Sequence, residues 1–259
     1  MKVHNIAICL DDSYCPGAIA LINSIKCYHK GKKICINILY DNNFSNHSEY
    51  ELKRCLEGYE CNFIKISISK AIPKIRYFKS ITCGKLYIAE YLDVDRCLYL
   101  DCDTICLCNL EYLFNKELNS YSLGAVIDPR YTIIPQHLGN IPKKMIPHRL
   151  NEKPGLNSGV LIIDINFWKN NDYTKKTTDW IIKNQHYLTL PDQAAINFFI
   201  EGKFQILEKK WNVCLYKTSV QRNDNISILH FNGQIKPWME KHNKFGEIWR
   251  KYYGQSFCT

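Results

Sequence analysis

The sequence lacks an apolar run long enough for a membrane span or for the core of a signal peptide; its first apolar stretch covers only residues 5–10. It also lacks a Cys-x-x-C pair, a dense block of lysine and arginine in the body of the chain, and the signature of any nucleic-acid-binding module. We therefore expect a cytoplasmic protein that does not bind nucleic acid.

The 13 cysteines are an odd number, and most of them stand inside apolar runs. A chain of 259 residues can bury a sizeable core without disulfide bonds. We interpret the cysteines as reduced thiols that act as small core residues. A zinc site built from Cys102, Cys106 and Cys108 is the alternative, although these residues do not have the spacing of a structural zinc site.

The net charge of +9 suits an anionic membrane surface or a phosphorylated substrate. Much of the positive charge gathers in residues 236–257, where five Lys or Arg residues alternate with six aromatic ones. This mixture is typical of a peripheral contact with an anionic membrane at its inner face. A packed C-terminal helix with a solvated basic face would have the same composition, so both interpretations stay open.

Short apolar strands alternate with helical patterns along the chain, which predicts an α/β fold with a mostly parallel sheet and helices on both faces. The strands are expected at residues 5–10, 34–40, 62–68, 97–100, 122–127, 158–165 and 226–231, and the helices at 18–30, 48–57, 84–92, 172–185 and 191–202. Ser48 and Glu51 are the predicted capping box of the second helix. Residues 129–155 are polar, rich in proline and the best candidate for a mobile loop.

Acidic side chains follow three of the predicted strands: Asp11 with Asp12, Asp101 with Asp103, and Asp128. Ligands of such sheets bind at the carboxyl ends of the strands. Asp101 and Asp103 point the same way because side chains alternate along extended backbone, and two like charges side by side require a positive partner such as a divalent metal.

The pair Asp101 and Asp103 also resembles the start of a haloacid-dehalogenase-type phosphohydrolase. That motif has threonine or valine at its fifth position, which is Ile105 here, and it usually stands near the beginning of a chain. We therefore disfavour this alternative.

Other polar residues stand at predicted element ends. Small residues around Gly159 would let a ligand approach the backbone closely. His230 ends a strand, and Gly233 and Lys236 follow it. One imidazole with two carboxylates suits Mn²⁺, and a lysine with backbone amides suits a diphosphate.

The ordered set "YLDCDT", "NSGVLIID", "DQAAIN" and "H-x-x-G-x-x-KPW" resembles the family 8 glycosyltransferases, the group of bacterial lipopolysaccharide galactosyl- and glucosyltransferases and of glycogenin. The resemblance runs from residues 9–14 to residues 230–238. It implies a GT-A fold with one catalytic domain over 1–235, divided into a nucleotide-binding half (about 1–105) and an acceptor-side half (about 106–235), followed by a tail over 236–259.

The resemblance further implies retaining transfer of galactose or glucose from a UDP-sugar to a saccharide or glycolipid acceptor, in surface polysaccharide or lipooligosaccharide synthesis. It makes Asp101, Asp103 and His230 the ligands of Mn²⁺ or Mg²⁺. The residues that match the family's other donor contacts, including the sugar pocket, are Asp11, Ser13, Tyr14, Lys85, Asp101, the backbone of Cys102, Asp128, Asn157, Asp192, Gln193, Gly233 and Lys236.

Asp192 and Gln193 are the candidates for catalysis. Some family members have an acid where this chain has Ala194, and no carboxylate stands out as the nucleophile. A covalent intermediate and assistance of the acceptor by the leaving phosphate both stay open. Two other functions stay open as well: a catalytically silent nucleotide-sugar or glycan binding protein on the same fold, and a self-glucosylating enzyme like glycogenin.

Overall fold

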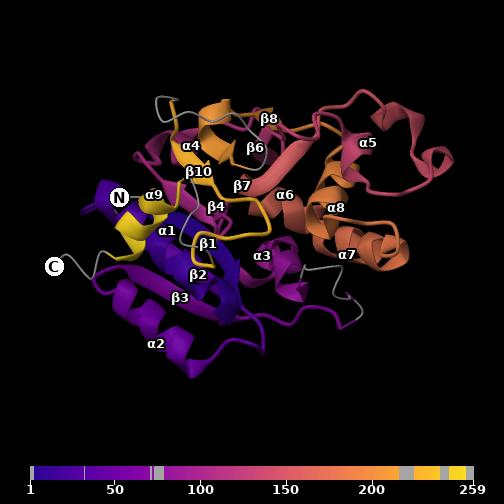
Figure 1. Cartoon of the computed structure of the whole chain (residues 1–259). Helices are drawn as coiled ribbons and strands as arrows, with labels where there is room; N and C mark the ends of the chain where they lie inside the picture. The colour runs from indigo at the N-terminus through magenta and orange to yellow at the C-terminus, as the bar shows by residue number, and fades with distance from the viewer. Residues whose placement is uncertain are drawn as a thin grey trace.

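The main sheet of the computed structural model has seven strands in the order β3-β2-β1-β4-β7-β6-β8 (Figure 1). The structure describes residues 3–31, 33–70, 72, 79–215, 225–239 and 245–254. The first four strands of this order are parallel, whereas β7 is antiparallel to β4 and β6, and β8 is parallel to β6. The bounds are β3 Glu60–Lys65, β2 Ile34–Tyr40, β1 His4–Leu10, β4 Arg96–Leu100, β7 Leu156–Asp164, β6 Leu123–Ile127 and β8 Gln205–Ile206. The predicted α/β architecture with a mostly parallel sheet is confirmed.

Two helical layers cover the sheet because its central strands are apolar on both faces. In β1, Ile6 and Ile8 join the core beneath the first layer, while Ala7 joins the core beneath the second. The first layer holds α1 (Cys15–Tyr28), α2 (Asn46–Cys55) and the short α4 (Glu111–Asn115). The second holds α3 (Ile88–Tyr91), α6 (Ile165–Asn170), α7 (Tyr173–Asn184) and α8 (Pro191–Ile200).

A small second sheet, in the order β5-β10-β9, brings the end of the chain back to the acidic turn after β4. Its strands are β5 Thr104–Cys106, β10 Ile228–His230 and β9 Val213–Cys214. Antiparallel pairing of β10 with β5 sets His230 opposite Thr104, directly beside Asp103. The fold therefore joins two segments more than 120 residues apart in the sequence at one point.

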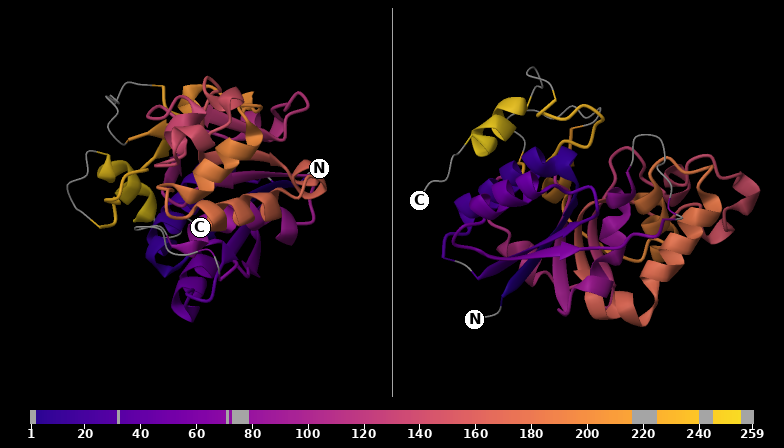
Figure 2. Two further views of the ribbon diagram at one scale, coloured as in Figure 1. Left: turned by 90° about the vertical axis from the view of Figure 1, so that its right-hand side faces the viewer. Right: turned by 90° about the horizontal axis from the view of Figure 1, so that it is seen from below.

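The last described helix, α9 (Gly246–Tyr253), lies against α1, as Figure 2 shows from below. Phe245, Trp249 and Tyr252 are buried in a core cluster that includes Ala20 of α1. Among the described residues, this packing supports the packed-helix interpretation of the tail. Residues 240–244 and 255–259 of the predicted tail lie outside the described residues.

Two local predictions are wrong in detail. The second helix begins earlier than the capping box implied, because Ser45 is its N-cap and the Ser45 side chain accepts a hydrogen bond from the Ser48 amide at 3.2 Å. Glu51 instead pairs with Arg54. The helix predicted at 84–92 is a 3₁₀ helix over Ser80–Tyr87 followed by one turn of α3.

The segment 129–155 contains short helices, including α5 (Ile134–His137), and projects beside α8 (Figure 1). Its two ends are joined by backbone hydrogen bonds, among them Asp128 N to Gly155 O at 2.9 Å and Ile134 N to Lys153 O at 2.9 Å. The excursion is thus anchored at its base, directly beside the carboxyl end of β6. Its predicted mobility stays a prediction.

Every cysteine among the described residues is a free thiol, and most of these are buried, as the sequence predicted. None of the described helices is both long and apolar enough to pass through a lipid bilayer.

Candidate functional site

A cavity of about 920 Å³ opens at the carboxyl ends of the parallel strands, a volume within the usual range for ligand pockets. Its walls come from the residues after β1, β4 and β6, from the start of β7, and from the segment after β10. Since β7 is antiparallel to β4 and β6, its first residues lie at their carboxyl ends. This arrangement explains why motifs scattered along the sequence meet here.

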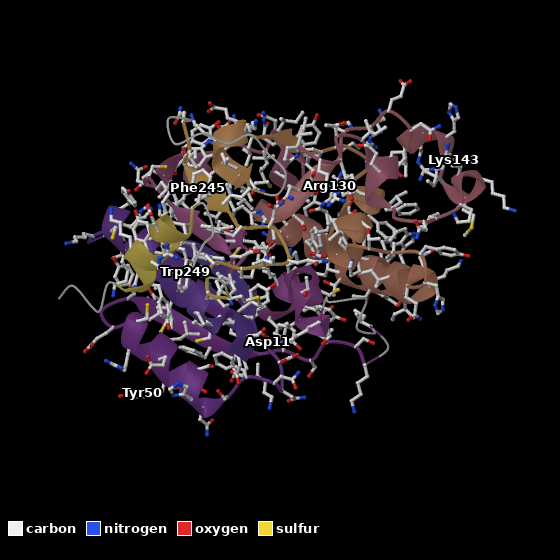
Figure 3. All side chains as sticks on the ribbon, in the orientation of Figure 1. Asp11, Tyr50, Arg130, Lys143, Phe245 and Trp249 are labelled. Atoms are coloured by element: carbon white, nitrogen blue, oxygen red, sulfur yellow. The ribbon has the colours of Figure 1, made fainter. Side chains whose placement is uncertain are left out.

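The cavity collects nearly all the residues that the sequence singled out. Its lining includes Ser13, Tyr14, Lys85, Asp101, Cys102, Asp103, Asp128, Asn157, Asp192, Gln193, His230, Gly233 and Lys236. Asp11 lies behind this wall, where its Oδ1 accepts hydrogen bonds from the amide and hydroxyl of Ser13 at 3.0 and 2.6 Å. Figure 3 shows Asp11 and Arg130 near the centre of the molecule and Lys143 at its outer edge.

Asp101, Asp103 and His230 form a group with the spacing of metal ligands: one ligand atom from each lies within 4.8 Å of the others. His230 Nε2 lies 3.2 Å from Asp103 Oδ1 and 3.8 Å from Asp101 Oδ2. Two carboxylates and one imidazole match the preference of Mn²⁺ for oxygen with some nitrogen. Among the described residues no such group includes Cys102, Cys106 and Cys108, so the zinc alternative has no support.

Asn212 holds the His230 ring in the orientation that a metal ligand needs. Asn212 Nδ2 donates to Asn157 Oδ1 at 2.8 Å, so Asn212 Oδ1 is left to accept from His230 Nδ1 at 2.9 Å. The Nε2 atom then faces the two carboxylates, an outer-shell arrangement common at metal sites. Burial would lower the pKa of His230, but Asp103 outweighs it and raises that pKa to about 10.

Gly159 leaves the space that His230 occupies. A Cβ at this position would lie 2.3 Å from His230 Cε1 and 3.0 Å from Asp101 Oδ2. The sequence predicted a close ligand approach at these small residues, but in the structure the approaching group is a protein side chain. The glycine thus serves the metal-type group indirectly, because its position in β7 leaves room for the His230 ring.

Lys85 is a buried cation between two acidic groups. Its Nζ lies 3.0 Å from Asp101 Oδ1 and 2.8 Å from Asp192 Oδ2, and only 3% of the residue is exposed. Burial alone would lower the pKa of Lys85, but the two carboxylates outweigh burial and raise it. The ammonium group therefore remains charged and joins the predicted metal group to the start of α8.

Lys236 is a second cation at the site, on the other side of the carboxylate pair. Its Nζ lies 2.5 Å from Asp103 Oδ2 and donates to the Phe231 carbonyl at 2.9 Å. Burial alone would raise the pKa of Asp103, but the charges of Lys236 and His230 hold it well below its usual range. The Asp103 carboxylate is thus ionised at neutral pH.

Asp128 is the centre of a hydrogen-bond network on the opposite wall. Its Oδ1 accepts from the amides of Arg130 and Tyr131, and its Oδ2 accepts from Asn157 at 2.8 Å and Gln193 at 3.1 Å. These four donors match the acceptor capacity of a carboxylate. Asp128 therefore fixes the two amide side chains that face the cavity.

Trp238 and Lys79 contact the residues that follow β1. Trp238 Nε1 donates to the Ser13 carbonyl at 3.1 Å, and the Trp238 ring packs edge-on against Tyr14 with centroids 5.6 Å apart. Lys79 pairs with Asp11 Oδ2 at 2.6 Å. The two Trp238 contacts tie the segment after β10 to the residues just before α1, and the Lys79 pair ties Asp11 to the residue before the 3₁₀ helix Ser80–Tyr87.

Sequence reasoning missed several residues of the site. Lys79, Tyr99, Ser158, Arg130 and Tyr131 line the cavity, and Asn212 and His137 support it from behind. Two of them carried a signal, since Ser158 lies inside the quoted motif "NSGVLIID" and Tyr99 begins the quoted motif "YLDCDT". The others belong to no motif, and only their contacts in the folded chain reveal them.

Comparison with known proteins agrees with this architecture. The galactosyltransferase LgtC, whose solved structure contains donor and acceptor sugar analogues, superposes with a TM-score of 0.80 at 23% identity and covers 98% of this chain and 96% of its own. That likeness establishes the fold and confirms the predicted GT-A architecture.

Similarity in sequence extends over most of the chain. Glycosyltransferase GlyB of Streptococcus pneumoniae is 23% identical over 97% of this chain, and lipopolysaccharide 1,2-glucosyltransferase of Escherichia coli K12 is 25% identical over 90%. The chain spans 62% of GlyB, 72% of the E. coli protein and about a third of two further streptococcal relatives.

The model of the family described as glycosyl transferase family 8 matches residues 5–242, which include every motif quoted above. The chain therefore belongs to glycosyl transferase family 8, as the order of its motifs predicted.

Proposed function

We propose that this chain transfers a hexose, galactose or glucose, from a UDP-sugar to a hydroxyl group of a saccharide or glycolipid acceptor, with retention of the anomeric configuration. The observation that carries the proposal is the metal-type group Asp101, Asp103 and His230 with Lys236 beside it, on one wall of a cavity large enough for a sugar nucleotide. Family membership supports the same reaction class.

In this proposal the donor lies across the cavity with its uracil near Tyr14 and its ribose near the Cys102 backbone. Tyr14 offers an aromatic face for stacking, and Asp11 with Ser13 shapes the same end of the cavity. Lys236 and the backbone at Gly233 are placed to bind the diphosphate, because both line the cavity next to Asp103.

The residues present fit a divalent cation, and we propose Mn²⁺ or Mg²⁺ at Asp101, Asp103 and His230. When bound there, such an ion would act as a Lewis acid that stabilises the negative charge of the departing diphosphate. Lys236 would add a second positive charge for the same oxygens. Lys85 holds Asp101 in place from the other side.

The hexose would lie against Asp128, Asn157, Asp192 and Gln193. Ala194 is fully buried in the core rather than in the cavity lining, so Asp192 is the cavity carboxylate that α8 provides. Asp192 Oδ2 contacts Lys85 and the Ser158 hydroxyl. Both the covalent route and the route assisted by the leaving phosphate are compatible with this arrangement.

A turnover assay tests the proposal. With Mn²⁺ and each of UDP-galactose and UDP-glucose, the chain should release UDP, and a saccharide acceptor should raise the rate and gain one hexose by mass spectrometry. NMR of the product should show the anomeric configuration of the donor. Tight binding of the donor without release of UDP would instead favour the catalytically silent binding protein, and an added hexose mass on the chain itself would favour the self-glucosylating alternative.

The name of the E. coli relative supports surface glycan synthesis as the setting, and we propose action on the cytoplasmic side of the membrane.

The buried aromatic residues Phe245, Trp249 and Tyr252 pack against the core, so they are not available to enter a membrane. We propose that the exposed basic residues Arg250 and Lys251 of α9 contact anionic lipid instead. Reversing both charges to glutamate should then abolish binding to anionic vesicles at low salt and leave UDP affinity unchanged. Equal vesicle binding by the variant would contradict this proposal.

A further inference from the structure

We propose that His137, which belongs to no sequence motif, is a positioning residue that fixes the amide orientation of Gln193 through its neutral Nδ1 atom. The inference rests on the proposed function, in which Gln193 faces the transferred sugar. It concerns how that side chain is kept in one of its two amide orientations, which differ in whether the oxygen or the nitrogen points to a given neighbour.

The neighbours of Gln193 determine which end of its amide is oxygen. The Ser158 backbone amide can only donate, and it lies 3.0 Å from Gln193 Oε1. Asp128 Oδ2 can only accept while ionised, and it lies 3.1 Å from Gln193 Nε2. Because both contacts demand the same orientation, the amide nitrogen must also be the atom that faces His137 Nδ1 at 3.0 Å.

This orientation determines the tautomer of His137. Gln193 Nε2 has one hydrogen for Asp128 and one for His137, so His137 Nδ1 must accept and cannot carry a proton. The ring proton is then on Nε2, which donates to the Tyr131 carbonyl at 2.6 Å. The histidine thus links the segment after β6 to the start of α8.

The surroundings of His137 favour its neutral form. The residue is 1% exposed, and burial lowers its pKa from the ordinary value of 6.5, opposed by Asp128 and the Tyr131 carbonyl. Gly155 leaves room for the ring, since a Cβ there would lie 2.2 Å from His137 Nε2. The Tyr131 ring packs edge-on against the His137 ring, with the two ring centroids 5.5 Å apart, and the Arg130 guanidinium lies over the Tyr131 ring. The charged groups that face His137 are therefore Asp128 and Arg130.

Protonation of His137 would place an N–H against the amide N–H of Gln193. The amide would then have to rotate and give up its hydrogen bonds to Ser158 and Asp128. Because the histidine pKa is lowered, this change occurs only as the pH falls below 6.5. The wild-type turnover number, measured at saturating Mn²⁺ and UDP-sugar, should therefore fall on the acid side.

Two substitutions separate this role from simple anchoring of the loop. His137→Asn keeps an acceptor near the Nδ1 position and loses the donor to Tyr131, whereas His137→Gln keeps a donor near Nε2 and loses the acceptor to Gln193. We expect kcat to stay within about 3-fold for His137→Asn and to fall about 10- to 100-fold for His137→Gln, with KM for the UDP-sugar little changed in both. The reverse order, or equal kcat in both, would overturn the proposal.

An NMR measurement on the wild-type chain does not depend on turnover or on the folding of either variant. Long-range ¹H–¹⁵N spectra at neutral pH should show His137 with a proton on Nε2 and none on Nδ1, its ring signals being assigned by through-bond correlation to the His137 backbone in uniformly labelled chain. A proton on Nδ1 would overturn the proposal. If wild-type chain with this tautomer turns over no UDP-sugar, the proposed function fails while the orientation of Gln193 stands.

Discussion

Asp103→Asn is expected to reduce the affinity for UDP in the presence of Mn²⁺ by more than about 100-fold and to abolish hexose transfer, because a ligand residue should cost more than the 10- to 100-fold loss typical of outer-shell residues. Asparagine keeps the size of the side chain but removes the charge that Lys236 and His230 both face. Calorimetric titration of UDP into variant and wild type measures the difference.

Asp179→Asn is the matched control for this change. Asp179 is an exposed residue of α7 whose contact is the surface pair with Lys175. The same chemical change there should leave UDP affinity and thermal stability unaltered, since exposed ion pairs contribute little. Metal-dependent binding by Asp103→Asn equal to that of the control would show that Asp103 is no ligand.

Lys85→Met is expected to destabilise the fold by about 3–5 kcal/mol, the usual cost of removing one partner of a buried ion pair. Methionine fills a similar volume but leaves Asp101 and Asp192 without their shared cation. Because the pKa of Lys85 is raised, its contribution is full at neutral pH and is lost only as the pH rises above the ordinary lysine range, about 10.4. Denaturant unfolding at pH 7 measures the loss.

A double variant separates stability from function at this position. Adding Asp192→Asn to Lys85→Met removes one of the two uncompensated carboxylates, so part of the lost stability should return. Hexose transfer should be absent in both variants, because both lack the cation that holds Asp101 and Asp192. Lys175→Met provides the exposed control and should change stability by less than about 1 kcal/mol. Normal stability of Lys85→Met alone would contradict the buried pairing described here.

Much of the fold was predictable because the apolar pattern of the strands is strong. Ile6 and Ile8 alternate with Ala7 between two buried faces, and the acidic residues that follow mark the strand ends. A parallel sheet brings those ends to one edge. The convergence of Asp101, Asp103 and Asp128 on one cavity therefore followed from the order of the strands. His230 and Lys236 stood out by their place after a predicted strand, and the resemblance to the family implied their roles.

The remainder depends on contacts that no local pattern encodes. Asn212 and His137 act through hydrogen bonds to residues 18 and 56 positions away. The start of α2 was misplaced because Ser45 and Ser48 are both residue types that favour the N-cap position. In the structure Ser45 is the N-cap, and its amide donates to Asp12, which is distant in the sequence. The tail was ambiguous because aromatic side chains serve equally to pack a helix and to enter a membrane.

Calorimetric titration of UDP into the wild-type chain, first with Mn²⁺ and then with EDTA, tests the central claim most directly. The account predicts binding with Mn²⁺ that weakens by more than about 100-fold once the metal is removed, since three described side chains and the diphosphate would share the ion. Equal binding under the two conditions, or no binding under either, would contradict a metal-dependent UDP-sugar site in this cavity.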